Sequence, residues 1–429
     1  MPFEDLLQVL KPEQLAFIWD IVKNWIWVPL AILFFYLTVT LYLFLIRERW
    51  LSRTKWITLE IKIPKEILKP IKAMENVFSN LWAIYDPANP RERWLEGKVP
   101  LSISCEIVSI DGEPHFYIRV PIKFQPLVES AIYSQYADVE ISVVDDYTKY
   151  VPLDIPNKDW EMWGTDYILN KPDSYPIKTH PFFELEREIK EEKRVDPMSF
   201  LLEGLSKLGP GEQLWVQITA VPVTNLENNW VSRGEKIRDK LAKRILQDAP
   251  KPLIQEAAEV LISGPPVPSA EKEIFPPEMR LTPGERDVIV GVENKIGKHG
   301  FETNIRFIYL AKRDVYFPPN FRSVMGFFAS FATQNLNALR PWTNTITKIH
   351  TLLFWFLDKR RLYIRKRRMF RNYIRRFSPL FPRRGGTYVL NIEELATLFH
   401  FPSKIVAPAP TLPRVEVKKR EAPPGLPTE

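Results

Sequence analysis

The stretch that decides the fold is residues 26–46, which read IWVPLAILFFYLTVTLYLFLI and contain no charged side chain. At about 1.5 Å of rise per residue, a helix of this length spans roughly 30 Å, which is the thickness of a bilayer core. A soluble helix this long normally has one polar face, and this stretch has none. The sequence therefore predicts a transmembrane helix, with the lipid bilayer as a partner of the chain.

The flanks of this stretch indicate its orientation and indicate that it stays on the chain. The first 25 residues carry four acidic and two basic side chains, whereas a signal peptide has a basic start and a small-residue cleavage site. Basic residues flank membrane helices on the cytoplasmic side, and here they follow the span as Arg47, Arg49, Arg53 and Lys55. For residues 1–55 we expect a single pass through the cell inner (cytoplasmic) membrane, with the N-terminus outside and the C-terminal body cytoplasmic.

After the span, the pattern predicts an α+β body. Strand-like alternation and helical spacing follow one another, in the order β-α-β-β-α-β, at residues 56–63, 66–85, 101–110, 115–120, 124–136 and 139–144. Asp111-Gly112 separates the two middle strands, and this dipeptide is a strong hairpin signal. The order is that of a ferredoxin-like unit, which we predict over residues 56–150.

A second α+β unit is predicted over residues 160–313, with a helical insertion at 231–262. Residues 212–223 and 301–312 read as its strands. Asp196-Pro197 predicts a helix start, and Thr282 to Glu285 form a capping box with proline at the first helical position. Whether the two units are a true repeat stays open at this stage.

The remainder of the chain is expected to hold a helical basic region at 314–385 and a C-terminal segment at 386–429 that ends in a proline-rich tail. Within the basic region, residues 343–377 have the apolar spacing of one long amphipathic helix. The C-terminal segment reads as a short strand at 387–390 followed by a capped helical turn at 392–400.

Positive charge is concentrated in this basic region. The chain has a formal net charge of +7, but residues 359–384 hold twelve Lys or Arg and no acid; without them, 47 basic against 52 acidic residues leave −5. Such a segment is typical of a binding site for an anionic partner. Three interpretations stay open: the helix binds the phosphates of DNA, it lies on an anionic lipid surface, or it is a solvated or partner-facing helix. The candidate residues are Lys359, Arg360, Arg361, Arg365, Lys366, Arg367, Arg368, Arg371, Arg375 and Arg376.

No pattern typical of catalysis, a cofactor or a metal is present in the sequence. The histidines, at 115, 180, 299, 350 and 400, do not stand at ligand spacing from one another, and we expect His400 to be packed between its phenylalanine neighbours. Residues 291–299 depart from the phosphate-loop spacing. The single cysteine, Cys105, excludes an internal disulfide and is predicted to lie buried on a strand. We therefore expect a non-enzymatic protein without catalytic, cofactor-binding or metal residues.

Eight stretches after the span carry a resemblance to a known family. They are 73–85 (AMENVFSNLWAIY), 103–121 with its HFYIRVP, 128–147, 163–168 (WGTDYI), 208–216 (LGPGEQLWV), 281–286 (LTPGER), 305–312 (IRFIYLAK) and 390–402 (LNIEELATLFHFP). Together they resemble an uncharacterised bacterial membrane family associated with conjugative DNA transfer and type IV secretion. In that family the module resembles the membrane-anchored N-terminal part of HerA-like or coupling-protein ATPases, or stands beside a separately encoded one.

The resemblance implies a function for the whole chain. Because the sequence has no nucleotide site of its own, it would be the membrane-anchoring half, a non-catalytic anchor or scaffold for a separate HerA-like or coupling-protein ATPase. DNA and further copies of the same chain, as a homo-oligomer, are the other implied partners. The alternative is a structural scaffold on the membrane surface that binds anionic lipid and has no nucleic-acid role.

Overall fold

The computed structural model describes residues 23, 27–64, 69–185, 196–242, 281–349, 355–376, 386–402 and 414–415. These residues fall into two compact units, one within Met1–Lys55 and Asp86–Pro100 and the other within Trp56–Tyr85 and Leu101–Glu429. The predictions for the segment before the span, for residues 243–262 of the helical insertion and for most of the proline-rich tail lie outside the described residues.

The first unit is dominated by helix α3 (Trp27–Arg53), none of whose residues is buried. By length and composition α3 could cross a membrane, with a mean hydropathy of 2.3, and it is the one such helix among the described residues. It contains residues 27–46 of the predicted span, so the expected apolar helix is present. Residues 86–100 join this unit through a π-helical turn, η2 (Glu92–Glu96). The sequence had placed them inside the first α+β domain.

The second unit is built on one sheet, to which ten strands of the described residues belong. The strands are β1 (Trp56–Pro64), β2 (Ile103–Ile110), β3 (Glu113–Pro121), β4 (Glu140–Val144), β5 (Trp160–Leu169), β6 (Glu212–Val223), β7 (Gly300–Lys312), β8 (Leu339–Pro341), β9 (Tyr388–Asn391) and β10 (Arg414–Val415). The main order is β4-β1-β3-β2-β6-β7-β5-β8, and every neighbouring pair in it is antiparallel. In addition, β9 pairs with β7 and β10 pairs with β1.

This strand order is symmetric about its centre when β1, β2, β3 and β4 are matched with β5, β6, β7 and β8. The first half runs β1, α4 (Lys72–Leu81), β2, β3, α5 (Gln125–Tyr133) and β4. The second half includes β5, α7 (Pro197–Ser206), β6, β7, α11 (Arg322–Ala329) and β8 in the same sequence of types. The two halves meet where β2 pairs with β6, from Ile103 opposite Ala220 to Ile110 opposite Gln213. The mixed α+β class expected for the body is therefore present.

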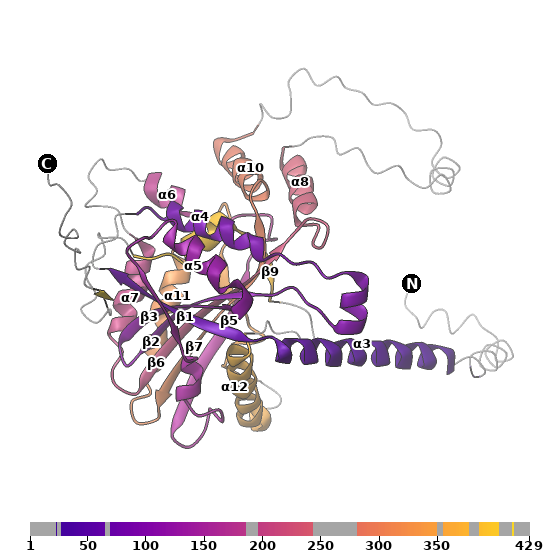
Figure 1. The fold of residues 1–429 in the computed structure, drawn as a ribbon, viewed down its shortest axis with the longest axis horizontal. Helices are drawn as coiled ribbons and strands as arrows, with labels where there is room; N and C mark the ends of the chain where they lie inside the picture. Colours follow the sequence, from indigo (N-terminus) through magenta and orange to yellow (C-terminus); the bar gives the residue numbers. More distant parts are fainter. Residues whose placement is uncertain are drawn as a thin grey trace, which may run out of the picture. The chain divides into compact units, whose positions relative to one another are not determined.

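Helices α4, α5, α7 and α11 share one core with one face of the sheet (Figure 1). Alternation along the strands supplies the sheet side of that core, as with Leu59, Ile61 and Ile63 on β1. The opposite face has a smaller core around Trp215 and Ile308. The other helical elements are α6 (His180–Leu185), α8 (Trp230–Leu241), α10 (Pro283–Ile296), α12 (Asp358–Ile374), α13 (Ile392–Leu398), η1 (Trp82–Ile84), η3 (Ile122–Phe124), η4 (Tyr147–Tyr150), η7 (Pro318–Phe321) and η8 (Trp355–Leu357).

Several local signals act as the sequence predicts. The hairpin between β2 and β3 turns at Asp111 and Gly112, whose φ angles are 52° and 89°. Both central residues of such a turn need positive φ, which the Asp-Gly pair tolerates. The Asp196 side chain caps α7, the Thr282–Glu285 capping box begins α10, and Cys105 is buried on β2.

Three boundaries differ from the expected ones because long-range pairing decides them. The expected units at 56–150 and 160–313 share one sheet through the β2–β6 pair. The second half also continues past residue 313, since α11 and β8 complete it and β8 pairs with β5. Finally, residues 343–349 are not helical: Trp342 donates from its backbone to Asp166 and the Thr347 hydroxyl binds Gly164. The basic helix α12 therefore begins only at Asp358.

Candidate functional site

The basic helix α12 packs the apolar residues of its second half against the sheet. Met369, Phe370 and Tyr373 are buried in the smaller core with Trp215 and Ile308. The rings of Trp215 and Tyr373 lie 5.4 Å apart. This face of α12 is occupied by the protein's own sheet, so what remains for a partner is the opposite, cationic face.

Arg376, just after α12, is a core residue. Its guanidinium lies between two carboxylates: Nε donates to Glu106 Oε1 at 2.9 Å, and Nη1 donates to Asp146 Oδ2 at 2.6 Å. The hydroxyl of Tyr147 also donates to Glu106, at 2.7 Å. Burial by itself raises the pKa of Glu106, but the charge and hydrogen bonds of Arg376 outweigh it and hold that pKa below its usual value. Burial by itself lowers the pKa of Arg376, but the charge of Glu106 and the hydrogen bonds to Glu106 and Asp146 hold that pKa well above its usual value.

Three further cations of the predicted set are fastened to the body. Lys366 pairs with Glu161 at 2.7 Å. Arg365 donates to backbone oxygens, the nearest being Ile346 at 2.9 Å, and Arg367 donates to the Leu153 carbonyl at 3.3 Å. These contacts orient α12 on the sheet, and they leave less of these three charges for an external anion.

The six remaining predicted residues are exposed. They are Lys359, Arg360, Arg361, Arg368, Arg371 and Arg375. Positions 361, 368, 371 and 375, together with exposed Ile364, follow the three-and-four spacing of one helix face. The structure thus brings the predicted cations together on and just after α12 but divides them into an exposed group of six and an inner group of four. Tyr363 and Phe356 are also exposed, near the start of the helix.

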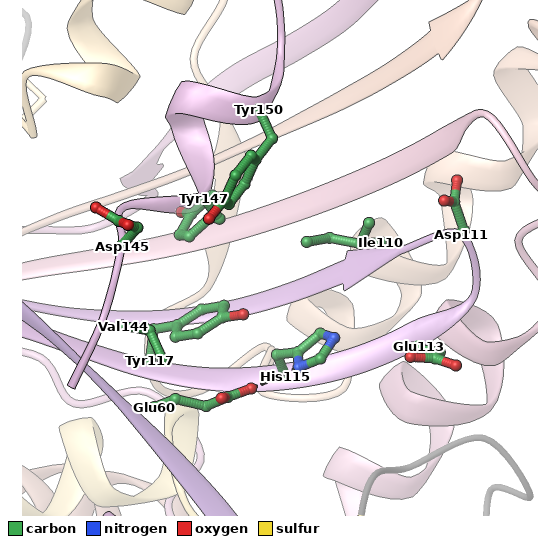
Figure 2. Close-up of a pocket in the computed structure, with 10 residues that line it drawn as sticks. All are labelled: Glu60, Ile110, Asp111, Glu113, His115, Tyr117, Val144, Asp145, Tyr147 and Tyr150. Carbon is green, nitrogen blue, oxygen red and sulfur yellow. Dashed lines mark hydrogen bonds and ion pairs between the residues drawn. The ribbon is translucent and has the colours of Figure 1, made fainter. Parts of the chain in front are cut away.

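Sequence reasoning did not find a pocket of about 490 Å³ that lies on the first half of the sheet (Figure 2). Its lining comes from β1 to β4, the β2–β3 turn and η4: Glu60, Ile110, Asp111, Glu113, His115, Tyr117, Val144, Asp145, Tyr147 and Tyr150. The carboxylates and phenol rings of this lining suit a cation better than an anion. Its charge is therefore opposite in sign to that of the outer face of α12.

Paired side chains order one wall of the pocket. His115 Nδ1 lies 2.8 Å from Glu60 Oε1, and this hydrogen bond is the main reason why the pKa of Glu60 is lowered. The His115 ring stacks on Tyr117, and Tyr117 stacks on Tyr147. Glu60 and Tyr117 face each other in the β1–β3 register. The alternation of the sequence could have predicted which face of its strand each of these two residues occupies. Only the register of β1 against β3 shows that Glu60 and Tyr117 are neighbours.

The comparisons with known proteins assign no family. No protein-family model matches the chain, and a search of curated proteins found no significant match. In the part of the chain that the structure describes, no group of three or more His, Cys, Asp or Glu side chains is placed to hold a metal ion.

Buried ion pairs elsewhere in the second unit join distant elements. Lys295 of α10 pairs with Glu394 of α13 at 2.9 Å, and both side chains are fully buried. Arg306 of β7 pairs with Asp166 of β5 at 3.0 Å. His400, expected to be packed among aromatic rings, is buried and lies 2.8 Å from Asp196 Oδ1. These pairs fix helices and strands to one another, and we assign them no role in binding.

Proposed function

We propose that this chain is a single-span, membrane-anchored and non-catalytic component of a DNA-transfer apparatus of the type IV secretion or conjugative kind. In this proposal α3 anchors the chain in the cell inner membrane with the body on the cytoplasmic side. The body forms a homo-oligomeric scaffold beside a separate HerA-like or coupling-protein ATPase. The outer face of α12 meets the phosphates of the transferred DNA. The sequence resemblance supports the apparatus and the ATPase partner.

The observation that carries the DNA part of the proposal is the division of α12 into two faces. Met369, Phe370 and Tyr373 are buried against the sheet, while six cations on or just after α12 are exposed. A helix that lies in a lipid surface inserts its apolar face into the acyl boundary. Over its second half α12 has no such face to offer, and closely spaced arginines suit a phosphate backbone.

One observation favours the alternative of a lipid-binding scaffold. Phe356, Tyr363 and Ile364 are exposed at and near the start of α12. They could enter a lipid surface while the neighbouring cations meet anionic headgroups. A flotation experiment distinguishes this alternative from the DNA proposal. If the alternative is right, zwitterionic nanodiscs that hold the protein will float together with anionic vesicles, and added short duplex DNA will not displace them.

The DNA proposal is tested with the full chain in zwitterionic nanodiscs and a fluorescein-labelled duplex. In the test variant, Lys359, Arg360, Arg368 and Arg371 are all changed to Gln. Each phosphate contact contributes about −0.9 to the slope of log affinity against log salt. We expect the slope to become shallower by about 3 to 4 if all four residues meet phosphates.

A control variant keeps the same change of net charge elsewhere. Lys207, Lys236, Lys240 and Arg322 are exposed and lie outside α12, and changing them to Gln should leave the salt slope within error of the unsubstituted protein. Equal salt slopes for the two variants would show that α12 does not contact the DNA. If the unsubstituted protein shows no salt-dependent affinity for the duplex, the DNA proposal is wrong.

The two halves of the sheet also support an inference about the scaffold. We infer that β1 to β4 form a ferredoxin-like unit and that β5 to β8 repeat it. The support is the shared order of element types and the pairing order β4-β1-β3-β2, which the second half mirrors as β6-β7-β5-β8. In such an arrangement β2 and β6 close one edge of each half. The opposite edges, at β4 and β8, are then the places where further copies of the chain could pair.

A further inference from the structure

The segment Asp86–Pro100 lies against the C-terminal part of α3 within the first unit. The Tyr42 hydroxyl of α3 donates to the Trp94 carbonyl at 3.2 Å. Gly97 has a φ of +74°, and a Cβ atom there would lie 2.5 Å from the Ile46 carbonyl carbon. Any other residue would be strained here, because the backbone has positive φ and an added Cβ would press against the backbone of α3. The segment therefore follows α3 from Ile46 back to Tyr42.

Three charged side chains of this segment pair with one another. Lys98 Nζ lies 2.9 Å from Asp86 Oδ1 and 3.1 Å from Glu92 Oε2. The same Glu92 oxygen accepts a hydrogen bond from the Asn89 backbone at 2.9 Å. These contacts link the two ends of the segment to η2 and close it into a loop.

The tip of the loop presents large apolar side chains outward. Trp94 is 50% exposed and Leu95 is 65% exposed. Arg91 and Arg93, just before them, are exposed too. A tryptophan beside an apolar residue, with arginines next to them, is the combination found at the boundary between headgroups and acyl chains.

The contact with Tyr42 sets the depth of this tip relative to α3. Tyr42 lies five residues before Arg47, the first charged residue after the apolar stretch. At about 1.5 Å of rise per residue, this is roughly 7 Å on the apolar side of Arg47. Interfacial elements bury their apolar side chains by about 5 to 10 Å. The Trp94 backbone is therefore at headgroup–acyl depth whenever α3 spans a bilayer.

We propose that Asp86–Pro100 is a second membrane contact, in which Trp94 and Leu95 enter the lipid interface of the leaflet where α3 leaves the bilayer. The loop fixes the tilt and depth of the span, with Arg91 and Arg93 available for lipid phosphates. This inference rests on the proposed membrane anchoring and adds a lipid-binding element outside the span.

The test reads the depth of single labels in nanodiscs that hold the full chain. Cys105 is buried and burial raises the pKa of its thiol, so it reacts little and an introduced cysteine can be labelled with an environment-sensitive fluorophore. The test variant is Leu95→Cys. Leu37→Cys, in the middle of the apolar stretch, reports whether α3 is inserted. Leu226→Cys, at a site that is 95% exposed in the second unit, is the aqueous control.

Lipids that carry a spin label at a shallow or a deep position quench the fluorophore by contact. We expect the shallow label to quench Leu95→Cys at least about twofold more than the deep one, as interfacial residues require. The same comparison should favour the deep label at Leu37→Cys and show no quenching at Leu226→Cys. If Leu95→Cys behaves like Leu226→Cys while Leu37→Cys is quenched, the loop is not a membrane contact although the anchor stands. If Leu37→Cys is not quenched either, the anchoring and the loop contact are both wrong.

Discussion

At Arg376 the chain leaves α12 with a φ of +53° and buries a guanidinium between Glu106 and Asp146. Changing Arg376 to Ala would leave the Glu106 carboxylate, which is fully buried, without its counter-charge. Removing one partner of a buried ion pair typically costs about 3 to 5 kcal/mol. We expect a loss of this size in the free energy of unfolding, measured by denaturant titration of the detergent-solubilised protein.

Arg371→Ala is the matched control for this prediction. Arg371 lies on the same helix but is exposed, and surface substitutions usually change stability by no more than about 0.5 kcal/mol. For DNA binding the order should reverse: among folded molecules, Arg371→Ala should lower the affinity for DNA more than Arg376→Ala does. Similar unfolding midpoints for both would show that the Arg376 pair contributes little to stability.

The sequence could predict that cations gather at residues 359–376, because charge density is a local property. It could not divide them into outer and inner groups. Arg376 and Arg375 are neighbours of the same type, yet one is buried and the other exposed. The difference depends on Glu106, which lies 270 positions away in the chain. The pocket residues Glu60 and Tyr117 were missed for the same reason.

Among the elements, α7 and α11 approach each other at a glycine. A Cβ atom at Gly204 would lie 2.3 Å from the Ser323 Cβ, so a larger side chain must push the two helices apart. Overpacking of this kind typically costs about 1 to 3 kcal/mol. We expect Gly204→Val to lower the free energy of unfolding by about this amount, measured by the same denaturant titration.

Glu203→Val serves as the control for the helix pair. It places the same side chain one residue earlier on α7, at an exposed position. It loses a surface ion pair with Lys207, which is worth about 0 to 1 kcal/mol. A larger loss of stability for Glu203→Val than for Gly204→Val would contradict the close approach of α7 and α11.

Elements whose signals are local were predicted well. The Asp111-Gly112 turn and the Thr282 capping box depend on residues within four positions of one another, and the strands β6 and β7 have clear patterns. Elements that exist through a distant partner were missed. Strand β8 has three residues and forms by pairing with β5, and the loop at residues 86–100 takes its place from α3.

At the scale of the whole molecule, the sequence could not predict that β2 and β6 pair and join the two halves into one sheet. Each half has its own strand and helix pattern, and local patterns suggest two separate domains. The register that pairs Cys105 with Ile218 spans more than a hundred residues of chain. The two strands lie in the middle of the sheet and continue one buried face from β1 to β7. Because the two halves share this core, we expect them to unfold as one unit.

Phe328→Ala tests that coupling. Phe328 of α11 is fully buried and contacts Tyr167 of β5 and Phe327, so the change acts within the second half. Truncating a buried phenylalanine costs about 3 to 5 kcal/mol. If the sheet unfolds as one unit, the slowest-exchanging amides of β1 and β3 in the first half lose the same free energy of protection as those of β7. Hydrogen exchange followed by mass spectrometry measures both. The control Phe317→Ala, at an exposed site, should leave the amide protection of both halves unchanged. If Phe328→Ala lowers protection only in β5 to β8, the halves unfold independently despite the β2–β6 pair.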